Sequence, residues 1–218
     1  METKLYTKLY NTVDIIKDII ENSDFKKLFD YCNDKYKLPT FIFSGVGKNW
    51  YICEKEMKTY LSMGINARSL DCTHALHGDL GMLMDKDEDK VLIFISKSGK
   101  TKEMEKLVYV VKDLVQKQII KNIKICALFL KNKNEFAYIY DYVMNPRNTD
   151  DADIDAEIDD KGLIPSLSIH ITQMVLDILG VKLYEQRDGL VENYKYNHLA
   201  GNNGNKLGMS KYLENIKV

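Results

Sequence analysis

A hydroxyl-rich turn between an apolar strand and a helix is the part of this sequence best suited to bind a phosphate. Ser96, Ser98 and Thr101 surround Gly99, and they follow the apolar run at residues 91–95. Hydroxyls and free backbone N–H groups at the positive end of a helix favour an anion. The Walker spacing is absent, and turns of this kind also serve as plain helix caps. The sequence therefore predicts either a phosphate site or simple capping here.

A second turn places a lysine where a helix is expected to begin. Gly45 and Gly47 flank Val46 directly after a short apolar strand, and Lys48 follows them. The two glycines allow a tight turn and a close approach of the backbone to a ligand, but the third glycine of a dinucleotide fingerprint is missing. A cation at a helix start opposes the helix dipole. This mismatch favours a functional role for Lys48 over that of a solvated surface lysine.

Two histidines, His74 and His77, lie three residues apart, with Asp79 close behind them. They can share one helical face, and the aspartate could orient a ring or join it on a metal. Because a His-Glu-x-x-His pattern is absent, acid–base chemistry is favoured over metal binding, although His77 stays a possible ligand. A surface loop with incidental histidines is the alternative.

The most acidic stretch of the chain lies at residues 150–160 and contains seven Asp or Glu residues. A calcium loop would need glycine at Ala156 and glutamate at Gly162, so an EF-hand is rejected. A solvated loop is expected for most of these acids.

Strands that alternate with helices must position these groups. The strands are predicted at residues 40–44, 68–71, 91–95, 123–130 and 138–144. This alternation predicts a parallel, doubly wound sheet, in which ligands bind beyond the carboxyl ends of the strands. The three turns described above all follow strands, so we expect them to converge at that edge.

Helices are predicted at both ends of the chain. Residues 1–37 are expected to form two helices that precede a single domain at residues 38–218, and they either pack outside the sheet or contribute to oligomer contacts. The first helix is predicted to bury an apolar stripe of Leu5, Leu9, Val13, Ile16 and Ile20. A strong final helix begins at Pro165–Ser166. The tail after it is expected to be irregular, because it contains Gly204 and Gly208.

Composition limits the choice of partners. The 31 basic and 32 acidic residues leave a net charge of -1, so no overall field attracts nucleic acid or a membrane. Four scattered cysteines form no Cys-x-x-Cys pair, and no secretion signal is seen. No apolar run is expected to reach the length that spans a bilayer. A cytoplasmic protein is predicted.

Four motifs together resemble the arabinose-5-phosphate isomerase family of the sugar isomerase (SIS) domain superfamily. They are the glycine–lysine turn at 45–48, the His-Gly-Asp-Leu-Gly-Met block at 77–82, the serine turn at 95–99 and His-Leu-Ala-Gly at 198–201. The likeness runs from about residue 38 to about residue 208. It implies a three-layer α/β/α sandwich with a five-stranded parallel, flavodoxin-like sheet. It also implies a form without the paired cystathionine-β-synthase modules that many members carry.

The resemblance implies interconversion of D-ribulose 5-phosphate and D-arabinose 5-phosphate through an enediol, in a homotetramer or dimer. It places Lys48, His77, Glu103, Glu157 and His198 at active-site positions. The residues that it implies for substrate or phosphate binding are Ser44, Gly47, Ser96, Ser98, Thr101 and Ser166. No cofactor is expected to be required, and the effect of a divalent metal is left open.

Carboxylates and histidines suit the proton transfers of such a reaction, and Lys48 could neutralise the enediolate or hold the phosphate. We expect a histidine to open the sugar ring and a glutamate to move the carbon-bound proton, without deciding which of each. The alternatives are a hexulose- or heptulose-phosphate isomerase, and a non-catalytic sugar-phosphate sensor. As a further hypothesis, His198 in the tail completes the site of a neighbouring copy.

Overall fold

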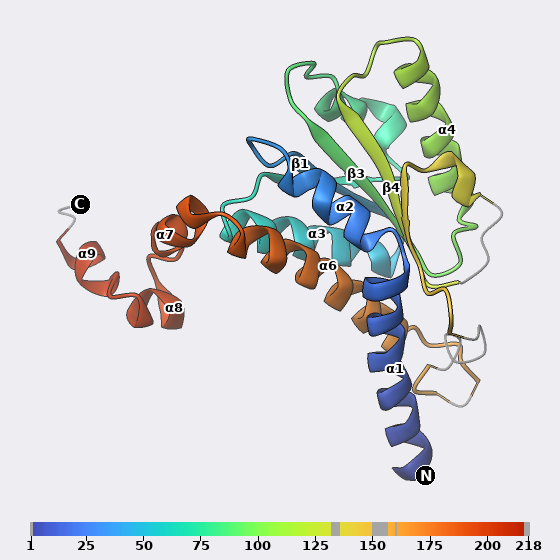
Figure 1. The fold of residues 1–218 in the computed structure, drawn as a ribbon, viewed down its shortest axis with the longest axis horizontal. Coiled ribbons are helices and arrows are strands. Elements are labelled where there is room, and N and C mark those ends of the chain that lie inside the picture. Colours follow the sequence, from blue (N-terminus) through green and yellow to red (C-terminus); the bar gives the residue numbers. More distant parts are fainter. Residues whose placement is uncertain (1, 132–135, 150–156, 160, 216–218) are drawn as a thin grey trace.

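A five-stranded parallel sheet forms the centre of the protein. The computed structural model describes residues 2–131, 136–149, 157–159 and 161–215 (Figure 1), so most of the acidic stretch predicted to be a solvated loop lies outside the described residues. The strands are β1 (Thr40–Gly45), β2 (Ala67–Asp71), β3 (Lys90–Ser96), β4 (Ile123–Phe129) and β5 (Tyr142–Met144). Their order is β2-β1-β3-β4-β5, and every pairing is parallel. The predicted doubly wound sheet is confirmed, and its order is that of flavodoxin-like folds.

Helices cover both faces of the sheet, which gives three layers. One face packs against α1 (Glu2–Asn22), α2 (Phe25–Asn33), α3 (Lys48–Ser62) and α6 (Leu167–Glu185). The other face packs against α4 (Lys102–Gln116) and the short 3-10 helices η1 (Ala75–His77), η2 (Asp79–Leu83) and η3 (Ala137–Ile139). Successive residues of β3 enter opposite cores, because side chains alternate along a strand. All seven residues of β3 are therefore buried.

Helix α6 (Leu167–Glu185) is apolar over most of its length and packs into one layer of the protein. By length and composition it could cross a membrane, which corrects the expectation that no apolar run has that length. Half of its apolar window is buried inside the protein, where Ile171, Val175 and Leu179 pack against α3 and the sheet. A buried core helix passes the same test.

The predicted apolar stripe of α1 is wrong for its first half. Ile15 and Ile19 are buried, whereas Leu5, Leu9 and Val13 are exposed. The second half of α1 packs its apolar side chains against α2 and α6, and the first half extends past the sheet (Figure 1). Helical periodicity alone does not show where the covering surface ends.

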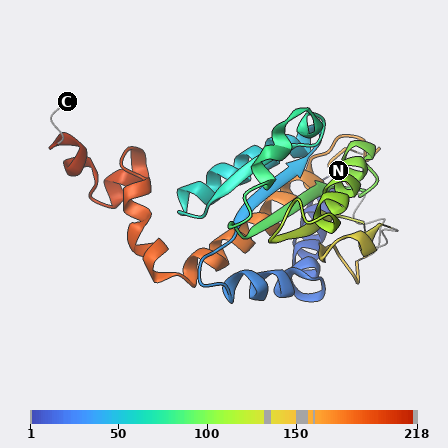
Figure 2. The ribbon, with the colours of Figure 1, turned by 90° about the horizontal axis from the view of Figure 1, so that it is seen from above.

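The tail is helical, which corrects the expectation of an irregular segment. It forms α7 (Asp188–Asn197), α8 (Gly201–Lys206) and α9 (Ser210–Glu214), an arm that projects from the body (Figures 1 and 2). Gly204 lies inside α8, where a Cβ would stand 2.7 Å from the Leu199 backbone. The close packing at this point therefore requires glycine. The arm begins at Arg187, whose Nη2 donates to the carbonyl oxygens of Asn33 and Lys35 at the end of α2, both at 2.8 Å.

Candidate active site

The turns after β1 and β3 converge on a cavity at the carboxyl ends of the strands. The chain leaves these neighbouring strands toward opposite faces, into α3 and α4, so a crevice opens between the two turns. The cavity has a volume of about 320 Å³. Its lining comes from the β1 turn, the β3 turn, the end of β4 and the start of α6, namely Val46, Lys48, Asn49, Lys97, Leu130, Pro165, Ser168, Ile169 and Thr172.

A larger cavity of about 440 Å³ lies at the opposite edge of the sheet, where α7 begins. It is lined by residues of the turns that enter β1 and β2 and by the start of the arm. It contains none of the residues predicted to take part in chemistry. We therefore place the candidate site at the smaller cavity, where the ligand position of a doubly wound sheet lies.

The serine turn is held in place by its own hydroxyls. Ser96 Oγ accepts a hydrogen bond from the backbone N–H of Gly99 at 3.0 Å and lies 3.1 Å from Thr101 Oγ1. Gly99 has a φ of 71°, a left-handed conformation that favours glycine. Ser98 Oγ accepts from the Lys100 N–H at 3.2 Å. The turn thus leads directly into the N-terminus of α4, the position predicted for a phosphate.

Lys48 is the first residue of α3 and lines the cavity with an exposed side chain. The turn before it is possible because Gly47 adopts φ 62° and ψ −124°, which a residue with a Cβ rarely does. The predicted position of Lys48, at the start of a helix and beside the ligand crevice, is confirmed. Nothing in the geometry tests its predicted role in the reaction.

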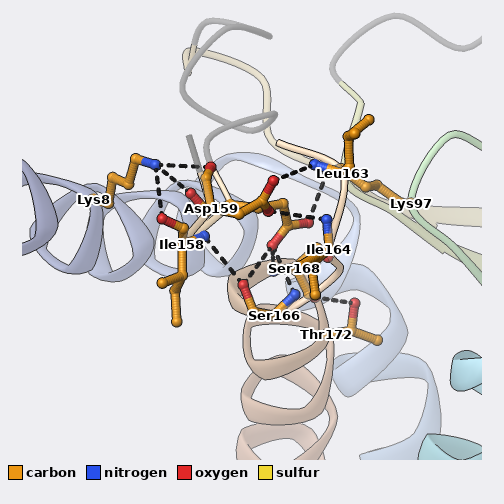
Figure 3. A network of polar contacts seen from close by, with 10 residues as sticks. Lys8, Lys97, Ile158, Asp159, Leu163, Ile164, Ser166, Ser168 and Thr172 are labelled. Atoms are coloured by element: carbon orange, nitrogen blue, oxygen red, sulfur yellow. Dashed lines mark hydrogen bonds and ion pairs between the residues drawn. The ribbon is translucent and has the colours of Figure 1, made fainter. Parts of the chain in front are cut away.

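Four donors hold the carboxylate of Glu157 at the start of α6, and the residues that supply them, Lys97, Ser166 and Ser168, are labelled in Figure 3. Its Oε1 accepts from Lys97 Nζ at 2.8 Å. Its Oε2 accepts from the backbone N–H of Ser166 at 2.9 Å, from that of Ser168 at 3.2 Å and from Ser166 Oγ at 3.2 Å. The carboxylate therefore caps α6 from eight residues upstream of Pro165, and only 1% of Glu157 is exposed.

These donors set the pKa of Glu157. Burial alone raises the pKa of this carboxyl, but the hydrogen bonds from Lys97, Ser168 and Ser166 outweigh that effect and lower the pKa to about 2. Glu157 is consequently ionised at any physiological pH. A base with so low a pKa removes a carbon-bound proton poorly, because general bases work best when their pKa lies near the operating pH.

Helix α1 holds the chain on both sides of this carboxylate. Lys8 Nζ donates to three consecutive backbone oxygens, those of Glu157, Ile158 and Asp159 (Figure 3). Three turns further along the helix, the buried Asp18 Oδ2 accepts backbone N–H groups of residues 147–149, at 2.9 to 3.0 Å. The sequence left the task of the N-terminal helices open between packing and oligomer contacts. The structure shows that α1 positions the segment containing Glu157.

Of the predicted site residues, the cavity lining includes Lys48, whereas the predicted serines, Thr101 and Glu157 lie beside it. Two further predicted residues lie at the same edge of the sheet. Glu103 is exposed in the first turn of α4, and His77 is exposed at the end of η1. The neighbouring His74 pairs instead with Asp71, at 2.9 Å. Within the described ranges, no three His, Cys, Asp or Glu side chains gather into a possible metal site.

Ser44 does not face the cavity, although the resemblance implied a role for it in binding. It is fully buried in β1, and its Oγ donates to the Leu70 carbonyl at 2.6 Å and lies 3.1 Å from Cys72 Sγ. The hydroxyl is thus engaged between β1 and β2. Ser166, in contrast, is half-buried at the site and contacts Glu157 directly.

His198 lies far from the other predicted residues in the same chain. It follows α7, and its ring stacks on Tyr194 with centroids 4.1 Å apart. The adjacent Asn197 donates to Ser62 at the far end of α3, whereas Lys48 is at the beginning of that helix. Fifteen residues of α3 correspond to a length of about 20 Å. The body alone therefore brings together Lys48, Ser96, Ser98, Thr101, Glu157 and Ser166.

Two residues of this site, Lys97 and Lys8, were missed by reasoning from the sequence. Lys97 lies between the two predicted serines, and its type, a cation inside a phosphate-type turn, was a usable signal. Lys8 gave no signal, because its contact partners lie about 150 residues away in the chain.

The fold and the cavity define the class: a flavodoxin-like α/β domain with a ligand site where the chain leaves β1 and β3 toward opposite faces. Within this class, the Haemophilus influenzae protein named "Probable arabinose 5-phosphate isomerase" is 30% identical over 166 residues, 76% of this chain and 44% of that protein. The Escherichia coli K12 arabinose 5-phosphate isomerase GutQ is also 30% identical over 166 residues, 76% of this chain and 47% of that protein. No protein-family model matches the chain.

A solved structure agrees with these relatives. The E. coli CFT073 protein c3406, determined in complex with arabinose 5-phosphate, superposes with a TM-score of 0.64 at 25% identity, covering 82% of this chain and 86% of that one. The chain is thus homologous to the arabinose-5-phosphate isomerases of the SIS superfamily. It spans about half the length of the curated relatives named above.

Proposed function

We propose that this chain is an isomerase that interconverts D-ribulose 5-phosphate and D-arabinose 5-phosphate. One observation supports this most directly: a single cavity is lined by Lys97 of the phosphate-type turn, by Lys48 and by the start of α6. The names of the relatives and the arabinose 5-phosphate complex of a homologous structure support the choice of pentose. A hexulose- or heptulose-phosphate isomerase would use the same geometry, and substrate assays separate the two.

The phosphate group is assigned to the turn that contains Ser96, Ser98 and Thr101. There the N-terminus of α4 and the hydroxyls supply donors to an anion. The sugar then extends across the cavity toward Lys48 and the start of α6. Lys48 is assigned to the enediolate, whose negative charge develops close to the lysine ammonium.

The reaction moves a carbonyl from C2 to C1 by proton transfer. A base removes a proton from C1 of the ketose and O2 gains a proton, which gives the enediol. O1 then loses its proton as C2 receives one, and the aldose forms. We assign the carbon proton to a glutamate, Glu157 or Glu103, and the opening of the arabinose 5-phosphate ring, in the reverse direction, to a histidine, His77 or His198. Because aldose and ketose are isomers, the reaction needs no redox cofactor.

We also propose that the protein is a homo-oligomer in which His198 of one copy completes the site of another. The arm supports this, since α7 has no buried residues and projects from the body (Figure 2). Exposed Val191, Tyr196 and Tyr212 give the arm an apolar surface that a second copy would cover. A cytoplasmic location is supported by the four buried, unpaired cysteines.

Proton NMR of the purified protein with D-ribulose 5-phosphate in heavy water tests the reaction. Formation of arabinose 5-phosphate with deuterium at C2 is expected. If hexulose, heptulose and pentulose phosphates all stay unchanged while one of them raises the melting temperature, a sugar-phosphate sensor replaces the enzyme.

Mixing inactive subunits tests the sharing of sites. His198→Ala and Glu103→Ala variants are each expected to lose activity alone. After dissociation and joint reassembly, hybrids should regain part of the wild-type activity, because one intact site can form from the two chains. No recovery in verified hybrids would count against shared sites.

A further inference from the structure

Lys97 lies in the turn assigned to the phosphate, yet its ammonium contacts a carboxylate on another segment. The turn runs from Ser96 to Thr101, and Lys97 lines the cavity with 28% of its side chain exposed. Its Nζ is 2.8 Å from Glu157 Oε1. Glu157 itself is almost fully buried, and Lys97 and Ser168, two of its donors, both line the cavity. Lys97 therefore separates Oε1 from the space in which a substrate would lie.

We propose that Lys97 couples phosphate binding to Glu157: a phosphate on the Ser96–Thr101 turn draws the Lys97 ammonium to itself and opens Oε1 to the cavity. The inference rests on the proposed function and adds a positioning residue to it. Lys97 can make this exchange because it is part of the turn. Its flexible side chain can rotate from Glu157 to the anion while its backbone stays hydrogen-bonded to the Leu130 N–H at 3.1 Å.

Electrostatics give the exchange a direction. A phosphate carries one to two negative charges, and it competes with a single carboxylate for one ammonium. Among the interactions that lower the pKa of Glu157, the hydrogen bond from Lys97 is the largest, and burial acts in the opposite sense. Loss of Lys97 therefore raises the pKa of Glu157 toward the range in which a general base works.

Among the described residues, the other charged groups near Glu157 do not contact its carboxylate. Lys8, on α1, donates to the backbone oxygen of Glu157 rather than to its carboxylate. Lys48, on α3, faces the same cavity, and Asp159 accepts the backbone N–H groups of Leu163 and Ile164, both at 2.9 Å. The Ser166 and Ser168 donors hold Oε2 and leave Oε1 free to act.

Selectivity for phosphorylated sugars follows from this coupling. A sugar without phosphate would meet a covered and weakly basic Glu157, even when it occupies the cavity. The difference between phosphorylated and unphosphorylated sugars should then appear in kcat as well as in KM. Without a phosphate, Lys97 stays on Glu157 and the carboxylate is not released.

A titration of Glu157 tests the coupling without any turnover. The full chain, labelled with ¹³C at the glutamate carboxyls, is followed by NMR between about pH 4 and about pH 8, and Glu157→Gln assigns the signal. Without phosphate, the wild-type Glu157 signal should stay constant, since its pKa lies below that range. With saturating inorganic phosphate it should titrate within the range. A wild-type signal that stays constant with phosphate overturns the proposal.

Two lysine variants separate the exchange from a direct effect of the phosphate charge. In Lys97→Met, Glu157 should titrate above about pH 4 without phosphate, and phosphate should shift the midpoint by less than about half of the wild-type change. The control Lys106→Met removes an exposed lysine of α4 and should match the wild type. An equal phosphate shift in Lys97→Met overturns the proposal, and Lys97→Arg provides a charge-retaining variant if Lys97→Met does not fold.

The result is separable from the proposed function. A phosphate-dependent titration in a protein that converts no sugar phosphate would leave the coupling standing and reject the isomerase. Turnover of a sugar phosphate by a protein in which phosphate does not change the titration of Glu157 would support the isomerase and reject the coupling.

Discussion

Two glutamates on the same face of the sheet are both buried beside a lysine, yet their pKa values move in opposite directions. Glu157 caps α6 and has its pKa lowered to about 2. Glu56 lies on α3, is fully buried, and has its pKa raised to about 8, chiefly by burial and then by the nearby Asp177 carboxylate. Both side chains are almost fully shielded from solvent, so the exposed fraction is not what distinguishes them.

The difference lies in the donors around each carboxyl. Glu157 accepts from Lys97, two backbone N–H groups and a hydroxyl. Glu56 accepts from Lys55 at 3.1 Å, but Lys55 also pairs with Asp177, and Glu56 Oε2 has no hydrogen-bond partner among the described residues. A carboxyl stays ionised inside a protein when the N–H groups of a helix end and a lysine ammonium donate to it. Where it has to share a cation with a second carboxylate, it takes up a proton.

Neutralising each glutamate should give the largest contrast. Glu157→Gln is expected to lower kcat by about 10²- to 10⁴-fold, the range of a lost acid–base group. Glu56→Gln should leave kcat within about threefold, because glutamine resembles the protonated form that Glu56 already adopts. Steady-state assays with D-ribulose 5-phosphate compare the two. Equal losses in both variants would remove the functional distinction.

The pH dependence of stability should separate the two groups by sign. The folded pKa of Glu157 is lowered, so its contribution is present above its ordinary pKa of 4.5 and is lost as the pH falls toward 2. The shift corresponds to on the order of 3 kcal/mol. The folded pKa of Glu56 is raised, so its contribution is present at low pH and is lost as the pH rises from 4.5 toward 8.

Urea unfolding of the wild type and Glu56→Gln at pH values near these limits measures the second effect. The variant should be more stable than the wild type at about pH 8 and should differ little at about pH 5. An identical pH slope in the two proteins would show that Glu56 is ionised in the folded state.

Removal of the Lys8 ammonium should have a smaller effect. Lys8→Ala removes three donors from the backbone around Glu157 and should lower the free energy of unfolding by about 1–2 kcal/mol. Because the chain around Glu157 is then less fixed, kcat should fall while KM changes little. Lys8→Arg, which keeps donors at this position, should recover most of kcat, whereas a Lys8→Ala variant that loses stability at unchanged kcat would assign Lys8 to stability alone.

The smallest expected effect concerns the neighbour of Glu56. Asp177→Asn removes the negative charge that raises the pKa of Glu56, so NMR titration of the variant should give a lower pKa for Glu56 than in the wild type. Glu157 should titrate as in the wild type. An unchanged Glu56 would assign its raised pKa to burial alone.

Much of the sheet could be predicted because its strands carry their own signal. The run at residues 91–95 is apolar without alternation, as expected of a strand covered on both faces, and β3 is buried throughout. The Gly47–Lys48 turn was placed correctly for a similar local reason. The short β5 was expected to begin at residue 138, but η3 occupies the first part of that stretch.

The parts that could not be predicted depend on contacts distant in the sequence. Lys97 contacts Glu157, which lies 60 residues away in the chain, and a single sequence does not indicate which distant residues form such a pair. The prediction for the apolar stripe of α1 was wrong in its first half because the helix extends beyond the surface on which it packs. The prediction of an irregular tail was wrong because Gly204 was interpreted as a helix breaker, whereas it is a point of close packing.

Arg187 has a consequence for the direction of the arm. The chain has 31 basic residues, and only three of them are arginines, one of which stands at the base of α7. Its planar group reaches carbonyl oxygens of Cys32, Asn33, Lys35 and Tyr36 together, which a single lysine ammonium cannot match in geometry. A change at this position would remove this anchor at the base of the arm and leave α7 held by its contact with α6 and by the Asn197–Ser62 hydrogen bond. Arg187 thus helps to fix the orientation of the arm relative to the body. We expect Arg187→Lys to leave that orientation less well defined, because a lysine ammonium cannot reach the same set of carbonyl oxygens.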